Sequence, residues 1–597
     1  MFDALFTTTT EYKKLSHALS GKGACALFGL PASGRAQVYA ALCRQLDKPL
    51  CIVTPGEAEA TRFAADLNTL GIPAAVFPAR DYVLRPIEGT AREYEYRRLA
   101  VLGELVGGRL RAVAVPAEAL TQFTTPKEDF CANTRTLHAG DTLLRDDLLA
   151  ALFGAGYTRR AQVDGPGQFS VRGDIVDIFA PDQKMPVRME FWGDEIDTLH
   201  TFDLTTQRRE DAIDKFYLSP AREVLFGKPA DAAEQLRAFL AKQRGKKKTA
   251  MADCMAADLD LLDGGAVPVN MDKYLAVRYP HPATVLDYFD DPILVAEEPA
   301  SIREADRATA YRRGEELKSL ILDGVLCAGL DNLYADPSYL WSKTGHYRTI
   351  CAENFARSMP DQPLKDIINA PAHTLPAWNG EVAGLLEDLK PLCDAGYTVT
   401  LLAGTDRAAA GLARDLRDKG ILVTTDAAAA PAAGLVQVLA GHLSAGCEFP
   451  FAKYALLTGR AFGETSSQKK KRKKAKDALN SLTEITPGDL VVHQNHGIGR
   501  YAGIQRMAVQ GVTKDYLRIE YDKKDVLYVP VTQLDLLSRY TAPGDSENVK
   551  LSRLGGAEWT KTRKKVRAAT EQMAKELIEL YARRKRAHGH AFPPDDT

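Results

Sequence analysis

Short apolar runs alternate with helical patterns over the first part of the chain. Residues 23–30, 50–54 and 110–115 are apolar runs with the length of buried strands. Apolar residues recur at helical spacing over residues 36–46 and 58–70. This succession of strand, turn, helix and strand predicts a parallel sheet with crossover helices on its faces.

The pattern changes at about residue 142, where apolar residues begin to alternate with polar ones. This alternation predicts short antiparallel strands with charged residues between them. An apolar run at residues 293–296 and helical spacing over residues 305–322 then indicate a return to α/β structure. A second α/β unit is predicted for residues 383–460.

Strict alternation returns over residues 484–540, where Leu517, Ile519 and Tyr521 alternate with polar neighbours. Turn residues separate the runs, and this predicts a small closed barrel of about five strands, similar to a Tudor domain. Helical spacing over residues 557–585 predicts a helix near the end of the chain.

A dense basic run, TSSQKKKRKKAK, precedes this predicted barrel at residues 465–476. Like charges repel one another and stay solvated, so we expect an interdomain linker. A phosphate-binding arm is the alternative, although no aromatic residue lies among the lysines to stack on bases.

Composition limits the classes of protein that fit. The 597 residues include 77 Lys and Arg against 78 Asp and Glu, so the net charge of −1 provides no global basic field for nucleic acid. No apolar stretch approaches the roughly 18 residues of a membrane span and no secretory signal is recognisable, so we expect a cytoplasmic protein with no membrane contact. The nine cysteines include no CxxC pair and predict neither a disulfide framework nor a metal site.

One motif has the spacing of a phosphate loop, GxxxxGK[ST], between a predicted strand and a predicted helix. Its glycines are Gly29 and Gly34, but Arg35 and Ala36 stand where lysine and a magnesium-binding hydroxyl are needed. We expect a degenerate loop without catalysis and without ATP or magnesium; a simple tight turn and a working ATPase are the alternatives.

The run at residues 293–298 ends in two glutamates but lacks the aspartate of a magnesium-binding strand, so we expect those carboxylates to be ordinary.

No catalytic triad or Cys/His arrangement is recognisable, and the histidine pairs His493/His496 and His588/His590 lack further ligands nearby, so we interpret both as structural or solvated. Arginines and aromatic residues interleave over residues 159–192, a mixture that is enriched at protein interfaces. It would also suit single-stranded nucleic acid, but acidic residues in the same stretch favour a protein partner.

This stretch resembles the UvrA-binding domain of the excision-repair protein UvrB. The matching elements are Tyr157 with Arg159, residues 167–174 (GQFSVRGD), 177–179 (DIF), 188–191 (RMEF), 193–196 (GDEI) and 202–203 (FD). Residues 488–501 (GDLVVHQNHGIGRY), 515–517 (DYL) and 527–530 (LYVP) resemble the RNA-polymerase-interacting domain of CarD-type regulators and of the transcription-repair coupling factors, the Mfd family. The order of the two units is that of the coupling factors.

The resemblance implies a multidomain α/β and β protein. Its expected parts are residues 1–124 and 216–345 as a UvrB-like α/β module with a degenerate phosphate loop, 125–215 as an inserted α+β UvrA-binding domain, 346–464 as a second small α/β domain, 465–483 as a basic linker, 484–545 as the polymerase-interacting barrel, and 546–597 as a helix leading to a translocase that the chain lacks.

The implied function is a non-catalytic adaptor between stalled RNA polymerase and UvrA, acting as a monomer. ATP, magnesium and most DNA contacts would belong to the translocase of the full-length protein. The implied UvrA-binding residues are Arg159, Phe169, Arg172, Asp174 and Phe179. The implied contacts with the polymerase β subunit lie on one exposed edge strand: Ile504, Gln505, Arg506, Met507, Ala508 and Val509.

Met507 is the expected anchor on that strand, and an ordinary barrel position is its alternative. Two other functions stay open at this point: a UvrB-like DNA-dependent ATPase, and a CarD-like transcription regulator that works through residues 484–545 alone.

Overall fold

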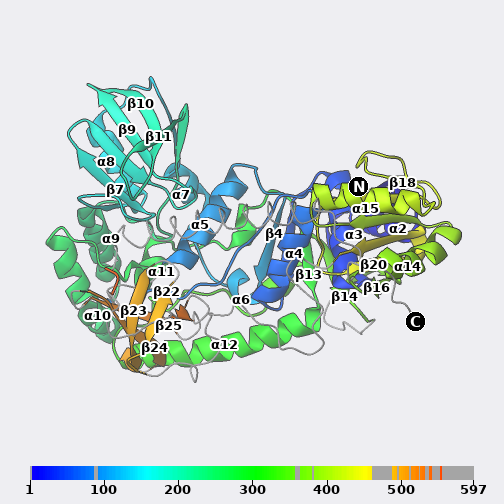
Figure 1. The fold of residues 1–597 in the computed structure, drawn as a ribbon. Coiled ribbons are helices and arrows are strands. Elements are labelled where there is room, and N and C mark those ends of the chain that lie inside the picture. The colour runs from blue at the N-terminus through cyan, green and yellow to red at the C-terminus, as the bar shows by residue number, and fades with distance from the viewer. Residues whose placement is uncertain are drawn as a thin grey trace.

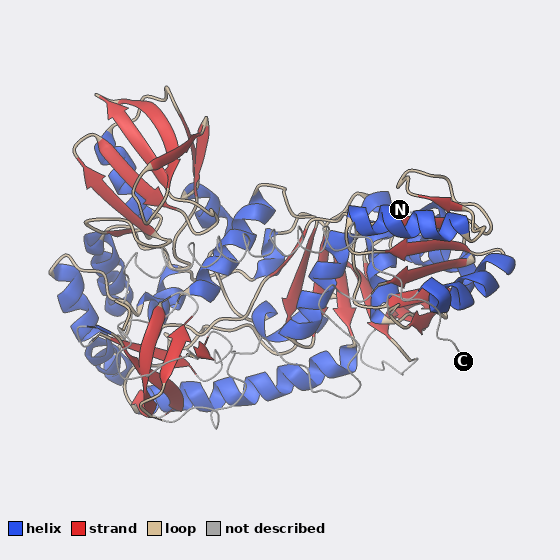
Figure 2. Ribbon diagram, viewed as in Figure 1, coloured by secondary structure: helices blue, strands red, loops and turns tan. Residues whose placement is uncertain are grey.

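A computed structural model describes most of the chain, in several sheets with helices packed on them (Figures 1 and 2). The described residues are 3–86, 92–355, 363–378, 382–459, 487–493, 496–509, 512–522, 525–530, 537–540 and 551–553. The predicted basic linker and the predicted C-terminal helix at residues 557–585 lie outside them. Among the described helices, none is long and apolar enough to cross a membrane.

The predicted parallel sheet is confirmed and has seven strands in the order β15-β1-β14-β13-β2-β4-β3. Alternate residues of its strands enter two different cores, one on each face, which explains why the strands are apolar throughout. The strands are β1 Gly23–Phe28, β2 Leu50–Thr54, β3 Ala74–Val76, β4 Ala112–Pro116, β13 Ile293–Glu297, β14 Arg348–Glu353 and β15 Leu364–Asn369. Helices that follow strands of this sheet include α3 Ala32–Leu46, α4 Glu57–Thr69 and α12 Pro299–Leu322.

The boundary expected at residue 346 differs from the structure. Strands β14 and β15 pair in parallel with β1 on its two sides, so the first sheet extends to Asn369. The next sheet begins at β16 His373–Leu375. Apolar pattern identifies a strand but does not tell which sheet it joins, and this is why the sequence placed both strands in the second unit.

The inserted domain contains the predicted short strands, in a six-stranded sheet that is antiparallel except for the pair β6 and β7. Its strands are β6 Thr158–Arg159, β7 Gln168–Arg172, β8 Ile175–Phe179, β9 Val187–Trp192, β10 Glu195–Phe202 and β11 Arg209–Ala212. The apolar face packs on helix α8 Arg145–Gly154 and on the strand pair β5 Arg135–His138 and β12 Lys215–Leu218. The domain projects from the body of the molecule (Figure 1).

Helices that the sequence pattern did not single out follow the inserted domain. They are α9 Pro229–Ala241, α10 Gly245–Asp263 and α11 Leu275–Arg278, with the short helices η1 Met271–Tyr274 and η2 Val285–Tyr288. Met251, Met255 and Leu236 build a core of their own here, together with residues from the loop after α12.

The predicted second α/β unit is confirmed as a six-stranded sheet, in the order β16-β20-β21-β17-β19-β18. Its further elements are α14 Val382–Asp394, β17 Thr398–Leu402, α15 Asp406–Asp418, β18 Val423–Thr424, β19 Val436–Leu439, β20 Gly446–Phe449 and β21 Tyr454–Thr458. It packs directly on the first unit, where the backbone N–H of Ser444 donates to Asp66 at 2.8 Å and the Ser444 hydroxyl donates to the same carboxylate at 2.6 Å.

The C-terminal sheet has the five strands that were predicted, in the order β25-β24-β23-β22-β26. They are β22 Leu490–His493, β23 Gly497–Val509, β24 Val512–Glu520, β25 Val526–Pro530 and β26 Leu537–Arg539. The predicted inward residues Leu517, Ile519 and Tyr521 are buried together. Among the described residues β25 and β26 do not pair with each other, so this sheet is open there rather than a closed barrel. Strand β24 packs against the long helix α12 (Figure 1).

A buried ionic network joins the inserted domain to the α/β module. Glu223, just after β12, accepts from Arg98 of α5 Glu93–Val106 at 2.7 Å and forms an ion pair with Arg80 at 3.0 Å. Arg80 in turn pairs with Asp272 at 2.7 Å, and the N–H of Glu223 donates to Glu95 at 3.0 Å. Burial opposes ionisation of Glu95, but the nearby arginines outweigh it and lower its pKa to about 2.

Candidate functional site

The phosphate-loop motif lies between β1 and α3, as its spacing predicts. Gly29 has a φ of +88°, and a Cβ there would lie 3.0 Å from the carbonyl oxygen of Ala370. Glycine is therefore required at this turn for two reasons, its backbone conformation and the close approach of the chain after β15. Helix α3 begins at Ala32, so Arg35 and Ala36 occupy its first turns and both are buried.

Arg35 forms an internal ion pair at the end of strand β13. Its Nε lies 3.0 Å from a carboxylate oxygen of Glu297, and its NH2 donates to Glu298 at 2.9 Å. Glu297 also accepts from the hydroxyl of Tyr39 at 2.6 Å. Arg35 and Glu297 are 2% and 1% exposed, so a buried carboxylate sits against the side chain that stands at the lysine position of the motif.

The charges of this pair are balanced inside the protein. Burial disfavours the charged form of Arg35, but the carboxylates of Glu297 and Glu298 outweigh it and raise the pKa of Arg35. Burial acts on Glu297 in the opposite sense and raises the pKa of its carboxyl, which Arg35 and Tyr39 partly counteract. The sequence predicted ordinary carboxylates at residues 297 and 298. For Glu297 that prediction is wrong, because its partner Arg35 lies 262 positions away along the chain.

The second α/β unit covers the loop from the other side. A Cβ on Gly34 would lie 2.8 Å from the Sγ of Cys447, and ring atoms of Phe449 lie 3.4 Å from the same point. Ser33 donates to the carbonyl of Gly446 at 3.5 Å. Strand β20 thus takes the space above the first turn of α3.

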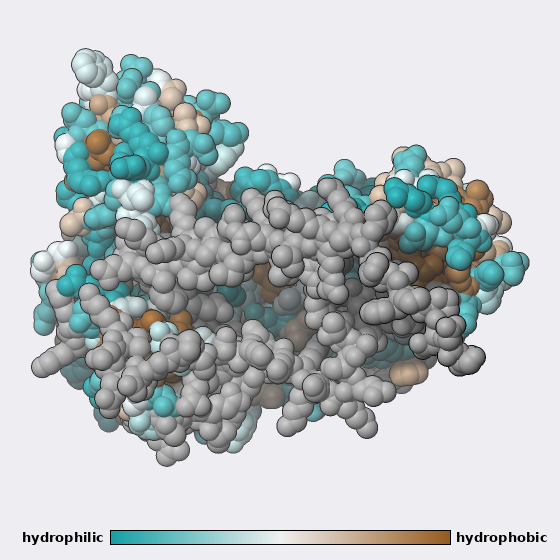
Figure 3. Space-filling model, in the orientation of Figure 1, coloured by the Kyte–Doolittle hydropathy of each residue, from teal (hydrophilic) through white to brown (hydrophobic). Residues whose placement is uncertain are grey.

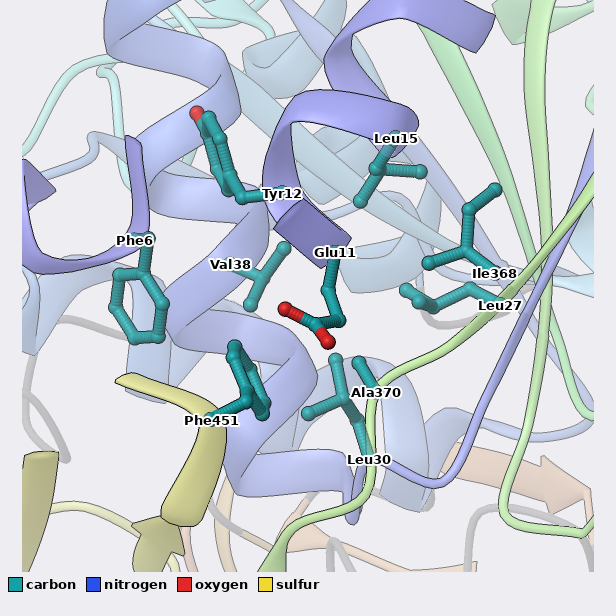
Figure 4. A pocket seen from close by; sticks show the side chains of 10 residues that line it. All are labelled: Phe6, Glu11, Tyr12, Leu15, Leu27, Leu30, Val38, Ile368, Ala370 and Phe451. Atoms are coloured by element: carbon teal, nitrogen blue, oxygen red, sulfur yellow. The ribbon is translucent and has the colours of Figure 1, made fainter. Parts of the chain in front are cut away.

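A small pocket nearby is lined mainly by apolar residues such as Leu27, Leu30 and Val38, with Glu11 beside them. This lining does not suit a phosphate group (Figure 4).

The polar face of the inserted sheet carries an ionic ladder across three strands. Register places Asp177 of β8 opposite Arg188 of β9, and Arg188 donates to it through Nε at 2.7 Å and NH2 at 3.0 Å. Arg172 of β7 donates to the same carboxylate at 2.5 Å. Asp177 is fully buried while the side chain of Arg172 is 46% exposed, so the buried carboxylate holds an exposed guanidinium in place. Hydrophilic residues cover most of this domain on the face that Figure 3 shows.

The five residues expected to contact a partner divide into two groups. Arg159 on β6, Arg172 at the end of β7 and Asp174 in the following turn are exposed. Phe169 is fully buried in the core under the sheet, and Phe179 is 7% exposed beside Val163 and Phe202. Phe169 supports the surface from within, because the pleat of β7 turns its side chain into the core under the sheet. Phe179 lies on the same face as Asp177, and Val163 and Phe202 cover it there.

Trp192 belongs to the interface-type mixture of arginines and aromatic residues in the sequence, but it was not among the predicted UvrA-binding residues. It ends β9 and is 82% exposed, more than the other exposed aromatic side chains of the described residues, such as Phe355 and Tyr311. Strand alternation puts it on the same face as Arg188 and Glu190. The N–H of its neighbour Phe191 donates to the carbonyl of Asp174 at 2.9 Å, so Trp192 and the Arg172–Asp174 turn lie at the same end of the sheet. An aromatic residue next to a Gly-Asp turn was the available signal.

The proposed polymerase-binding segment forms the second half of β23. Residues 504–509 pair with β24 in an antiparallel register from Ile504 opposite Leu517 to Val509 opposite Val512. Strand β22 pairs only with residues 497–500, so among the described residues the other edge of this half is unpaired. This agrees with the expected edge presentation. Ile504 is 44% exposed and Gln505 is exposed, whereas the side chain of the predicted anchor Met507 lies outside the described residues.

The histidine pair His493/His496 lies where this sheet meets the α/β module. The two rings are 4.7 Å apart, and His496 Nε2 lies 3.6 Å from a carboxylate oxygen of Glu93 on α5. Burial, together with His496, lowers the pKa of His493 to about 4. Our interpretation of this pair as structural agrees with these contacts. No group of three or more side chains suited to a metal ion occurs in the described part of the chain.

Comparison with known proteins assigns both the inserted domain and the C-terminal sheet to described domain families. Residues 136–224 match the family model of the UvrB interaction domain, and residues 485–541 match that of the CarD-like/TRCF RID domain. The transcription-repair-coupling factor of Bacillus subtilis (strain 168) is 29% identical over 584 residues, which are 95% of this chain and 49% of that protein. The corresponding factor of Staphylococcus haemolyticus (strain JCSC1435) is 28% identical over 585 residues, with the same coverage.

The resemblance to the transcription-repair-coupling factors is confirmed. The chain spans about half the length of the relatives it matches, namely their N-terminal half. The inserted sheet domain is thus the UvrB-interaction-like domain of the chain, and the C-terminal sheet is its RID-like domain.

We predict that Glu297→Gln destabilises the α/β module by about 3 kcal/mol, because it leaves the Arg35 guanidinium buried with only the partly exposed Glu298 as a partner. Glu298→Gln is the matched control and costs less than about 1 kcal/mol, since that carboxylate is 34% exposed. Urea unfolding of the two variants measures the difference. Equal stability of both variants would contradict the buried pair.

Stability of the RID-like domain should depend on pH through His493. Its folded pKa of about 4 lies below the ordinary 6.5, so the domain keeps this histidine neutral and loses stability as pH falls below about 6.5. The expected loss at pH 5.5 is about 1 kcal/mol. Unfolding midpoints at pH 7.5 and 5.5 measure it. His493→Gln removes this part of the pH dependence, and an unchanged dependence in that variant would rule out His493 as its source.

Proposed function

We propose that this chain is the adaptor part of a transcription-repair coupling factor, which binds stalled RNA polymerase through its β subunit and recruits UvrA. The observation that carries the proposal is the presence of two recognised interaction domains on one scaffold whose phosphate loop is closed by the Arg35–Glu297 pair. The adaptor acts as a monomer in the bacterial cytoplasm. In the full-length protein an ATP-driven DNA translocase would displace the polymerase.

The UvrA-binding surface is the end of the inserted sheet that carries Arg172, Asp174 and Trp192, with Arg159 on the neighbouring edge strand. Asp177 fixes the Arg172 guanidinium from below, so little side-chain entropy is lost when it pairs with an acidic partner. Trp192 provides the large apolar contact that interfaces use as an anchor. Phe169 and Phe179 contribute by holding the strands beneath.

The polymerase-binding surface is the unpaired edge of β23 at residues 504–509. A free edge exposes backbone N–H and C=O groups, which can pair with a strand of another protein. The exposed Ile504 would provide a side-chain contact of such a pairing, and Met507 stays the predicted anchor. We therefore place the β-subunit contact on residues 504–509 as a strand addition.

The chain does not hydrolyse ATP in this proposal. The phosphate loop has an arginine already neutralised by Glu297 and no hydroxyl at Ala36 for magnesium, and Cys447 and Phe449 fill the space above Gly34. ATP and magnesium are cofactors of the translocase, which also makes most of the DNA contacts. These same contacts weigh against a UvrB-like ATPase, and the match to coupling factors over 95% of the chain weighs against a CarD-like regulator working alone.

Two substitutions on the inserted domain test the UvrA surface. Arg172→Glu should abolish measurable binding of purified UvrA, and Trp192→Ala should weaken it about 30-fold, as expected for an interface hot spot. Both should leave binding to the polymerase β subunit unchanged. The matched controls are Arg237→Glu on α9 and Tyr311→Ala on α12, which are exposed residues outside the proposed surface. Biolayer interferometry measures all four variants against both partners.

Equal loss of both partners in a folded variant would reject this division of labour. Normal UvrA binding by Arg172→Glu and Trp192→Ala together would place the UvrA surface elsewhere.

The polymerase surface is tested with Ile504→Asp. A charge on the exposed half of β23 should weaken binding of the polymerase β subunit about tenfold, because desolvating a carboxylate at an interface is unfavourable. UvrA binding should not change. Ile367→Asp is the matched control, since Ile367 is 62% exposed on β15, the edge strand of the first sheet. Unchanged polymerase binding by Ile504→Asp would contradict the strand-addition site.

A further inference from the structure

Two cysteines that the proposed function does not use lie side by side in the helical part of the α/β module. Cys254 is on α10, and Cys327 is in the loop that follows α12. Both side chains pack in the same core cluster, and each thiol is the largest influence on the pKa of the other. The Cys254 thiol also donates to the carbonyl of Val325, two residues before Cys327, at 2.7 Å. The Cys254 thiol therefore joins the helix to the loop at this point.

A buried lysine lies against the pair. Lys273 is 4% exposed and donates to the carbonyl of Cys254 at 2.6 Å and to Asp258 at 3.0 Å. The hydrogen bond with Cys327 lowers the pKa of Cys254 to about 7, with Lys273 acting in the same direction and burial against it. Cys254 is partly exposed whereas Cys327 is buried, so a small oxidant reaches Cys254 first.

We propose that Cys254 and Cys327 form a redox-reversible disulfide. A disulfide needs sulfur atoms that meet without large backbone movement. The Cys254 thiol already touches the backbone two residues before Cys327, and both side chains pack in one core. The bond would link α10 to the loop that follows α12, and β24 of the RID-like domain packs on that helix. Reversible bonds of this type are those that occur in reducing compartments.

The chemistry requires one two-electron oxidant, and hydrogen peroxide suffices. The Cys254 thiolate attacks one peroxide oxygen, the O–O bond breaks, and a sulfenic acid forms with release of water after proton transfer. The Cys327 sulfur then attacks the Cys254 sulfur, an S–S bond forms, and the hydroxyl leaves as a second water. Both thiols together lose two electrons and two protons, and a dithiol reductant reverses the step.

Another cysteine pair provides an internal comparison. Cys25 on β1 and Cys351 on β14 are also close enough to interact, but both are buried inside the parallel sheet. Burial raises the pKa of each to about 12, so neither is a thiolate at neutral pH. Both pairs are thus close together and have a cation nearby, and it is the accessibility of Cys254 that distinguishes its pair.

The test treats the full chain with hydrogen peroxide at pH 7.5, blocks the remaining thiols with N-ethylmaleimide, and maps peptides by mass spectrometry with and without dithiothreitol. The expected result is a linked peptide pair containing Cys254 and Cys327 that disappears on reduction, while Cys25 and Cys351 remain alkylatable after unfolding. In Cys327→Ala the sulfenic acid of Cys254 has no resolving partner, so dimedone should label Cys254 in that variant and much less in the unsubstituted chain.

Two results would overturn the proposal. One is oxidation of Cys254 to the sulfinic acid without a link to Cys327. The other is a Cys254 that stays reduced while Cys131, an exposed cysteine on α7 Lys127–Ala132, is oxidised in the same sample.

Discussion

The buried network around Glu223 is the constraint on which the arrangement of the molecule depends. It joins α5 of the α/β module, the segment that leaves the inserted domain and, through Asp272, the helical part that follows. These segments are far apart in sequence and carry charges that water no longer solvates, so each group needs all its partners. The network therefore fixes the inserted domain, which carries the proposed UvrA surface, to the α/β module and to the helical part that follows it.

The ion pair of Arg35 with Glu297 also joins distant segments of the chain through buried charges, here inside the α/β module. A phosphate-loop fold normally has its charge completed by a nucleotide, whereas here a carboxylate from β13 completes it. The scaffold can then be stable without a ligand, which suits a part whose work is to hold two other domains. The loss of the loop's lysine and hydroxyl was visible in the sequence, and its structural replacement was not.

Much of the fold followed from local pattern. The apolar runs predicted the strands of the parallel sheet because both faces are buried, and alternation at Leu517, Ile519 and Tyr521 predicted the core of the C-terminal sheet. What local pattern lacks is the identity of distant neighbours. It therefore misplaced β14 and β15, missed the partner of Glu297, and put Phe169 and Phe179 on a surface where strand pleat and neighbouring elements bury them. Trp192 was part of the predicted interface-type stretch, but the sequence did not show that it is the exposed aromatic residue there, because exposure of one side chain has no periodic signature.

The most direct test of the central claim is whether one chain holds both partners at once. Analytical ultracentrifugation of the 597-residue chain with purified UvrA and the polymerase β subunit measures this in one mixture. Because the two proposed surfaces lie on different domains of one scaffold, the account predicts a complex containing all three proteins. Two binary complexes that exclude each other, with no species containing all three, would contradict a two-ended adaptor.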